Sequence, residues 1–476
     1  MSTNELCFSS AVALRERLAS GDLGAREVMQ AHLDRIAQVN PSLNAVVTLD
    51  AERALASADA ADARRARGEP LGALHGLPVG VKDLVATKGM RTTYGSLLFR
   101  DHIPGENALA ADRLEAAGAI IIGKTNTPEF GCGGGQTTNA VFGETRNPYD
   151  LNRSCGSSSG GSAVALAARM VPLADGSDFG GSLRHPAGHC NVVGFRPSPG
   201  RVPRFPGSLG WFTLSVDGPM ARTVADAALL LSAQAGPDDR SPIALDEDGA
   251  RFRAPLERDF KGVTIAWSRN LGFLPVDPRI SEVFERQRAT FEALGCNVVD
   301  ADPEIREALD VFKVLRAWRY TLDFGARVRD PHQRAVLKDQ LVWNTEEGFK
   351  LSAEDVARAE GMRTVLYQRM REFMQRYEYL VLPTNPTPAL PIDQSAISEI
   401  DGVAMRDYVE GAALKSVISV LGNPAISVPA GFTCAEQLPV GLQIVGRHRA
   451  DFSVLQLAHA FEGATQVYLQ LPELAR

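Results

Sequence analysis

Cysteine is scarce in this chain, and long apolar runs are missing from it. The six cysteines are scattered over 476 residues without a C-x-x-C pair. We expect them to be free thiols in a reducing compartment rather than a disulfide framework. No stretch of about 18 consecutive apolar residues occurs, so no membrane-spanning helix is predicted. With no signal peptide expected at the N-terminus, the predicted location is the cytoplasm.

Blocks of like charge are also missing. The chain carries 50 basic and 57 acidic residues, which gives a net charge of −7. Proteins that bind nucleic acids usually present a basic patch, so neither a nucleic acid nor a membrane is expected as a partner. A hydrophobic content of 45% over this length is enough to build a large core.

Strand and helix patterns alternate along much of the sequence. The apolar run 77–81 is predicted to be a buried strand that ends on Lys82. A helix is expected over 107–117 and a strand over 119–123, and the same rhythm recurs later. Such alternation predicts an α/β layered fold. Residues 303–377 keep a helical pattern throughout, which predicts a helical side subdomain.

Glycine and serine concentrate between residues 131 and 200. Their clusters read GCGGGQTTN, SCGSSSGGSAVALAARM and ADGSDFGGSLRHPAG, with apolar strand and helix segments between them. A flexible linker would lack those apolar segments. Glycines let backbone N–H groups approach a ligand closely, and serines supply hydroxyl groups. The region therefore predicts a polar site walled by backbone.

Nucleotide binding and cysteine chemistry are alternatives for such a region. The phosphate-binding pattern G-x-x-x-x-G-K-[ST] is absent, and Gly131-Cys132-Gly133 begins a G-x-G-x-x-G pattern without completing it. Cys132 and Cys190 have no identifiable base beside them in the sequence, which a cysteine nucleophile requires. Both alternatives are therefore weak.

Histidine-based chemistry also has little support. His185 and His189 are four residues apart, but Pro186 and Gly188 lie between them, so a regular helix is not expected there. No H-E-x-x-H pattern occurs, and Ser182 is not surrounded by a G-x-S-x-G elbow. We expect no metal and no cofactor.

Several separated segments together resemble the amidase signature family. SSGGSAVALAA is followed by DFGGSLRHPA, VGVKD lies upstream, and LPVGLQIVGR precedes the helical FSVLQLAHAFE near the end. Ser158 and Ser182 are 182 − 158 = 24 residues apart, which is the spacing of that family. The resemblance covers nearly the whole chain and is loosest over 303–377. It implies one domain over 1–476, with a central mixed, mainly parallel β-sheet covered by helices on both faces.

The resemblance also implies the catalytic roles. Ser182 matches the nucleophile, Lys82 the base, and Ser158 the relay between them. A serine hydroxyl is a poor nucleophile until a base takes its proton. Lysine can be that base only if its pKa falls well below the usual value of about 10.4. The family's relay serine follows a cis peptide bond. Ser157 stands where the family usually has glycine, and we still expect the Ser157–Ser158 bond to be cis.

Three further groups of residues follow from the resemblance. The oxyanion hole is expected to consist of the backbone N–H groups of Phe179, Gly180, Gly181 and Ser182. A supporting shell is expected to contain Ser157, Asp178 and Arg184, with the last two forming an ion pair. The substrate is expected to contact Gly131, Cys132, Gly133 and Gln136.

The predicted activity is hydrolysis of the C–N bond of a small-molecule amide through a seryl acyl-enzyme. Aryl amides, esters and carbamates all stay open as substrates, because they present the same kind of carbonyl group. The alternative is a glutamine-hydrolysing amidotransferase subunit that passes ammonia to a partner protein. We expect a monomer or a homodimer.

Overall fold

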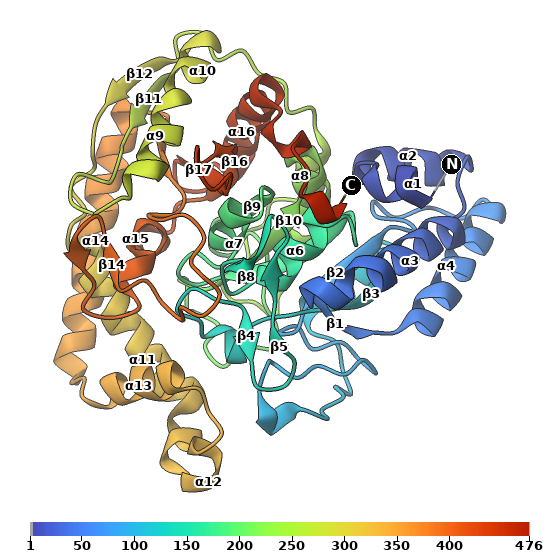
Figure 1. The fold of residues 1–476 in the computed structure, drawn as a ribbon, viewed down its shortest axis with the longest axis horizontal. Helices are drawn as coiled ribbons and strands as arrows, with labels where there is room; N and C mark the ends of the chain where they lie inside the picture. The colour runs from blue at the N-terminus through green and yellow to red at the C-terminus, as the bar shows by residue number, and fades with distance from the viewer. Residues whose placement is uncertain (1–2, 476) are drawn as a thin grey trace.

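A computed structural model describes residues 3–475, and its centre is an eleven-stranded β-sheet (Figure 1). From one edge to the other, the sheet contains β1 (Val46–Leu49), β3 (Ile120–Thr125), β2 (Pro78–Lys82), β8 (Leu173–Asp178), β10 (Val216–Ala221), β9 (Val193–Arg196), β16 (Ala425–Phe432), β17 (Pro439–Gly446), β13 (Tyr379–Pro383), β11 (Thr264–Trp267) and β12 (Asn297–Asp300). Three two-stranded ribbons stand apart from it: β4 (Thr138–Asn139) with β5 (Gly143–Glu144), β6 (Arg146–Asn147) with β7 (Asp150–Ser154), and β14 (Glu399–Ile400) with β15 (Val403–Ala404). The sheet gathers strands from nearly the whole chain.

The sheet is mixed, as expected, but its balance of strand directions differs from the prediction. Four neighbouring pairs are parallel, and six are antiparallel. The parallel pairs lie toward the two edges, and the middle of the sheet is antiparallel. One cause is visible in the sequence, because β16 and β17 are separated by a connection too short for the crossover that parallel strands require.

Sixteen α-helices of the described chain surround the sheet (Figure 1). They are α1 (Thr3–Phe8), α2 (Ala11–Ser20), α3 (Ala25–Leu43), α4 (Ala51–Ala66), α5 (Leu109–Ala116), α6 (Gly160–Ala167), α7 (Arg184–His189), α8 (Val224–Gln234), α9 (Pro278–Arg286), α10 (Arg288–Ala293), α11 (Ala308–Arg329), α12 (Pro331–Arg334), α13 (Asp339–Phe349), α14 (Ala353–Arg376), α15 (Ala413–Leu421) and α16 (Asp451–Thr465). Helix α6 packs on β8 and β2, α8 on β10, and α16 on β16 and β17. The α/β class is thereby confirmed.

The segment predicted to be helical, 303–377, contains α11, α12, α13 and α14. In Figure 1 these helices, coloured from yellow to orange, lie along one side of the molecule and extend beyond the sheet. Helix α14 begins with a capping box, in which the Ser352 hydroxyl and the Asp355 carboxylate each bond to the other's backbone N–H. Its residues Leu366, Met370 and Phe373 recur at helical spacing and are buried. Burying each such side chain contributes about 1.5–3 kcal/mol.

Helix α11 joins this helical segment to the rest of the molecule, together with α14. Helix α11 packs against α13, α14 and α15. Its residues Phe312 and Leu315 belong to a hydrophobic core that also contains residues of β13 and β17. Farther along the same helix, Tyr320 and Phe324 join a small separate core around Cys132. Helix α11 therefore contacts the core beside the sheet with its first half and the glycine-rich region with its second half.

Candidate active site

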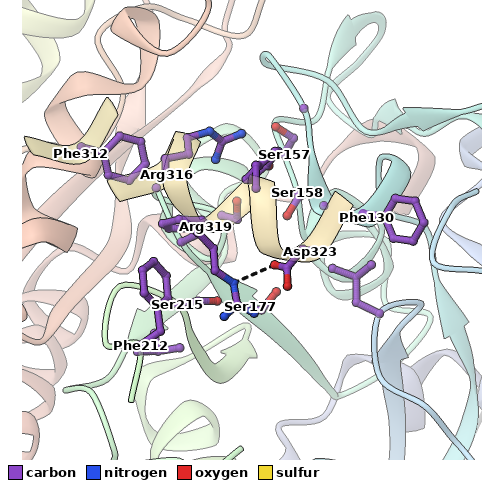
Figure 2. A pocket seen from close by; sticks show the side chains of 18 of the residues that line it. Phe130, Ser157, Ser158, Ser177, Phe212, Ser215, Phe312, Arg316, Arg319 and Asp323 are labelled. Carbon is purple, nitrogen blue, oxygen red and sulfur yellow. Dashed lines mark hydrogen bonds and ion pairs between the residues drawn. The ribbon is translucent and has the colours of Figure 1, made fainter. Parts of the chain in front are cut away.

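A cavity of about 460 Å³ lies where the glycine–serine clusters meet α11 (Figure 2). Its polar wall includes Ser157, Ser158, Ser177 and Ser182. Aromatic rings form much of the remaining surface, from Tyr94, Phe130, Phe179, Phe212, Phe312, Tyr320, Phe324 and Tyr408. Figure 2 shows α11 crossing the cavity with Arg316, Arg319 and Asp323 projecting from it. The volume fits a small organic molecule.

Lys82 ends strand β2 as predicted, and its side chain is fully buried among hydroxyl groups. Its Nζ lies 2.8 Å from Ser158 Oγ, 2.9 Å from Ser159 Oγ and 3.1 Å from Ser177 Oγ. Each hydroxyl can accept a hydrogen bond from an ammonium group or donate one to a neutral amine. We call these four residues, Lys82, Ser158, Ser159 and Ser177, the hydroxyl cluster.

The surroundings of Lys82 lower the pKa of its ammonium to about 7. Burial is the main cause, because it penalises the charged form. The negative potential of Asp175 acts in the opposite direction, and the Asp175 carboxylate accepts a hydrogen bond of 2.6 Å from the Lys82 backbone N–H. A lysine with such a pKa is neutral in about half of the molecules at neutral pH, and can then accept a proton.

The Ser157–Ser158 peptide bond is cis, as predicted. The backbone of Ser157 contacts His185, whose Nδ1 lies 3.2 Å from the Ser157 carbonyl oxygen. His185 was predicted to lie outside a regular helix, and that prediction is wrong, because α7 includes both His185 and His189. Pro186 is tolerated there because it occupies the first turn, where its missing N–H would have no helical partner.

Ser182 and the residues before it form a loop around a buried carboxylate. Asp178, at the end of β8, accepts hydrogen bonds from the backbone N–H groups of Gly181 at 2.9 Å and Leu183 at 3.2 Å. The predicted ion pair with Arg184 is confirmed at 3.0 Å, and Arg196 adds a second at 2.9 Å. We call Asp178, Arg184 and Arg196 the ion cluster.

The three side chains of the ion cluster are fully buried. Burial alone would raise the pKa of Asp178, but Arg184 and Arg196 hold it well below its usual range. The carboxylate therefore keeps its charge, and the loop is fixed by charge-assisted hydrogen bonds.

One of the four N–H donors predicted for the oxyanion hole is already used within the protein. The N–H of Gly181 already donates to Asp178, so it is not available to a substrate oxygen. In the described chain, the N–H groups of Phe179, Gly180 and Ser182 show no such protein acceptor. Glycine is required beside them: a Cβ at Gly180 would lie 2.8 Å from the Phe312 ring, and Gly181 has a φ of 115° with Lys415 directly beyond its Cα.

Only two of the four residues predicted to contact the substrate line the cavity. Gly131 and Gly133 line the cavity, and a Cβ at Gly131 would lie 3.3 Å from Ser158 Oγ. Cys132 and Gln136 lie outside the cavity lining. The Cys132 side chain is fully buried toward Tyr408, and the Gln136 amide donates to the carbonyl of Ile392. Their side chains are used in packing and in anchoring a distant loop.

Sequence reasoning missed five residues of the site. They are Ser159, Ser177, Arg196, Arg316 and Lys415. Ser159 and Ser177 lie inside the serine clusters and could have been selected by their position. Arg196 lies in the same region but outside the glycine–serine clusters, and Arg316 and Lys415 come from distant parts of the sequence. No local pattern marks these three residues.

Comparison with known proteins agrees with this geometry. The family model Amidase matches residues 27–455. An acylamidase from Rhodococcus erythropolis is 38% identical over 97% of this chain and 96% of its own. A glutamyl-tRNA(Gln) amidotransferase subunit from Synechococcus sp. (strain CC9902) is 35% identical over 97% of both chains. A bacterial aryl acylamidase of the amidase signature family superposes with a TM-score of 0.90 at 30% identity, covering 97% of this chain and 98% of that one.

The fold and the cavity together define a hydrolase that acts on the C–N bonds of amides. The chain belongs to the amidase family. Over residues 3–475, no helix has the length and apolarity needed to cross a membrane.

Proposed function

We propose that Ser182, Ser158 and Lys82 carry out acyl transfer in two halves. Ser182 Oγ attacks the carbonyl carbon, its proton passes to Ser158, and the Ser158 proton passes to Lys82 Nζ. The C–N bond then breaks, and the departing nitrogen takes the proton back through the same relay. Water then attacks the acyl-enzyme and gives a proton to the same relay, which returns it to Ser182 Oγ as the bond to the acyl group breaks and the acid leaves. The contact between Lys82 and Ser158, 2.8 Å long and fully buried, is the observation that carries this proposal.

The charge that develops on the carbonyl oxygen is assigned to the N–H groups of Phe179, Gly180 and Ser182. Such fixed donors stabilise a tetrahedral intermediate, and loss of one typically lowers the rate by about 10²–10³. The Ser158 and Ser182 hydroxyls share no hydrogen bond in the described chain, so the mechanism requires Ser182 to reach Ser158 when substrate is bound. Catalytic hydrogen bonds commonly tighten at that stage.

The proposed substrates are small acyl amides with an apolar or aryl portion. The aromatic rings of the cavity wall provide a surface for such a group. Relatives named acylamidase and aryl acylamidase support the same class. Esters and carbamates remain within the proposal because their carbonyl groups react in the same way.

The amidotransferase alternative rests on relatives that are 35% identical over nearly their full length. Free glutamine carries an α-ammonium group, which would need an unpaired carboxylate in the cavity. Asp323 is the one acidic residue among the lining residues of the described chain, and Arg319 pairs with it at 2.7 Å. The lining therefore offers no unpaired carboxylate for the α-ammonium group of glutamine, which counts against glutamine as the substrate.

A panel of substrates tests the proposal. The panel contains aryl amides, aliphatic amides, glutamine, esters and carbamates, each incubated with the wild type and with Ser182→Ala and Lys82→Ala. We expect hydrolysis of acyl amides by the wild type alone. Full activity in Ser182→Ala would overturn the mechanism, and exclusive turnover of glutamine with a partner protein would favour the alternative.

We also propose that the chain forms one domain, in which 303–377 is a helical subdomain at the substrate entrance. We further propose that the protein is cytoplasmic and is a monomer or a homodimer. The cavity-lining side of α11 supports the first point. Six free cysteines, five of them buried, support a reducing compartment. Light scattering and cell fractionation would check the oligomeric state and the location.

A further inference from the structure

Arg316 stands apart from the other cationic side chains of the cavity. It projects from α11, is only 8% exposed, and lines the cavity (Figure 2). Its Nε donates to Asn344 Oδ1 at 2.8 Å, and its Nη2 donates to Tyr408 Oη at 3.0 Å. Both acceptors are neutral. No carboxylate of the described residues lies within ion-pair distance of this guanidinium.

The neighbouring arginines of the cavity have the carboxylate partners that Arg316 lacks. Arg319 pairs with Asp323 at 2.7 Å, and Arg204 pairs with Asp217 at 3.2 Å. Both arginines line the same cavity, so their charges are compensated within the protein. Arginine stays protonated at any physiological pH. Arg316 is therefore a fixed, uncompensated positive charge in the cavity wall.

Aromatic rings hold this charge in place. The guanidinium carbon of Arg316 lies 4.6 Å from the centre of the Tyr320 ring, 5.5 Å from that of Phe179 and 5.7 Å from that of Tyr408. Ring faces attract cations, particularly where water is excluded. This arrangement orients the planar guanidinium without neutralising it.

The free donors of Arg316 face the cavity. A guanidinium has five N–H groups, and Nη1 donates to no residue of the described chain. Nη1 is also not among the polar atoms that are sealed from solvent without a partner, so it is accessible from the cavity. Phe179, which Arg316 contacts, lies three residues before Ser182. Arg316 and Ser182 also line the same cavity, so a substrate bound at Ser182 can present a second group to the unused donors.

Burial of an unpaired cation is unfavourable unless a counter-charge compensates it. A carboxylate on the ligand would supply that charge, because the fork of a guanidinium matches its two oxygens. We propose that Arg316 binds a carboxylate of the substrate, so that this amidase prefers amides that carry a free acid group. The inference rests on the proposed amide hydrolysis and adds the class of substrate to it.

Matched pairs of substrates test the preference. One series contains the mono-4-nitroanilides of succinic, glutaric and adipic acid, compared with 4-nitroanilides of straight-chain monocarboxylic acids of similar length. A second series compares N-acetylaminobenzoic acids with N-acetyltoluidines, which places the carboxylate on the amine side. We expect the wild type to have the higher kcat/KM for the acid in at least one series.

Substitution of Arg316 separates binding from structure. In Arg316→Gln, we expect the acid-to-neutral ratio of kcat/KM to fall by about 10- to 100-fold, mainly through KM of the acid, because a charge-assisted pair is lost. Arg316→Lys should restore part of the ratio. Arg369→Gln is the matched control, since it removes one positive charge from a partly exposed site on α14, where Arg369 pairs with Glu307; its ratio should equal that of the wild type.

Two results would overturn the inference. The first is a wild type that prefers the neutral member of every pair. The second is an Arg316→Gln variant that lowers kcat/KM equally for both members, since this would show a structural role alone. In either case, the proposed function would still hold if the wild type hydrolyses neutral anilides and Ser182→Ala does not. A wild type that hydrolyses no amide in either series would instead remove the proposed function itself.

Discussion

The hydroxyl cluster and the ion cluster meet the chain at neighbouring residues, Ser177 and Asp178, at the end of β8. Each holds a fully buried ionisable side chain, Lys82 in one and Asp178 in the other, but the two environments have opposite effects on charge. Lys82 is surrounded by neutral oxygen atoms, and burial lowers its pKa to about 7. Asp178 contacts two arginines, which keep its pKa well below the usual range. The first arrangement favours a side chain that can gain and lose a proton. The second favours a permanent charge that fixes a loop.

Because of this contrast, we expect substitutions in the two clusters to have different effects. Changes to the hydroxyl cluster should alter the reaction and its pH dependence more than the stability. Changes to the ion cluster should alter stability first, because each leaves a buried charge without its partner.

The largest effect is expected from removing the ends of the relay. Ser182→Ala and Lys82→Ala should each lower kcat by roughly 10⁴-fold or more, and the double variant should lose little beyond either single one, because residues that act as a unit are not additive. Steady-state kinetics on an anilide would measure this. Lys124→Met is a matched control, because Lys124 is equally buried but contacts Val85 and Thr87 outside the cavity. An equal loss in that control would contradict a specific role for Lys82.

The ion cluster should show its effect in stability. Asp178→Asn leaves Arg184 and Arg196 without their carboxylate, and we expect a loss of about 3–5 kcal/mol in the free energy of unfolding. Urea denaturation would measure it. Asp59→Asn breaks the exposed pair between Arg26 and Asp59 and should cost less than about 1 kcal/mol. Equal losses in the two variants would show that the ion cluster does not fix the loop.

These two clusters also show how far the sequence could predict the site. The resemblance selects Ser182, Ser158 and Lys82 because short motifs contain them, and Asp178 and Arg184 because they flank Ser182. The availability of the Gly181 N–H could not be predicted, since it depends on the rotamer of Asp178. Arg196 and Arg316 reach the site through the sheet order and the position of α11, which depend on long-range packing.

The fold, like the site, could be predicted only where a local sequence pattern determines it. Helix–strand alternation predicted the α/β class, and the helical pattern of 303–377 matches α11 to α14. Strand β1 could not be predicted, because its four residues lie between the long helices α3 and α4 and are too few to show a strand pattern of their own. The directions of the central strands were missed because direction depends on the connections rather than on the composition of each strand.

A smaller effect is expected from the glycines before Ser182. Gly180→Ala places a Cβ 2.8 Å from the Phe312 ring, and the resulting shift of the loop should lower kcat on the order of 10²-fold. Phe312→Leu in the same chain should restore part of the activity. Gly463→Ala, with open space around its Cα, should leave kcat unchanged. Wild-type kcat in Gly180→Ala would show that the loop tolerates displacement.

The smallest effect is expected from the two hydroxyls of the hydroxyl cluster that are not part of the proposed relay, those of Ser159 and Ser177. A hydroxyl that accepts a hydrogen bond from the ammonium stabilises its charged form, so Ser159→Ala and Ser177→Ala should each lower the pKa of Lys82 by about 0.5–1 unit. The acid limb of the kcat/KM profile would shift to lower pH by that amount. A shift to higher pH would mean that these hydroxyls favour the neutral amine instead.

The pH dependence of kcat/KM in the wild type tests the central claim most directly. Lys82 must be neutral to accept a proton, so activity should rise as the pH increases through a pKa of about 7 and then reach a plateau. The measurement requires a neutral anilide, whose own charge does not change over this range. A rise that continues to about pH 10, where an ordinary lysine titrates, would contradict the assignment of Lys82 as the base.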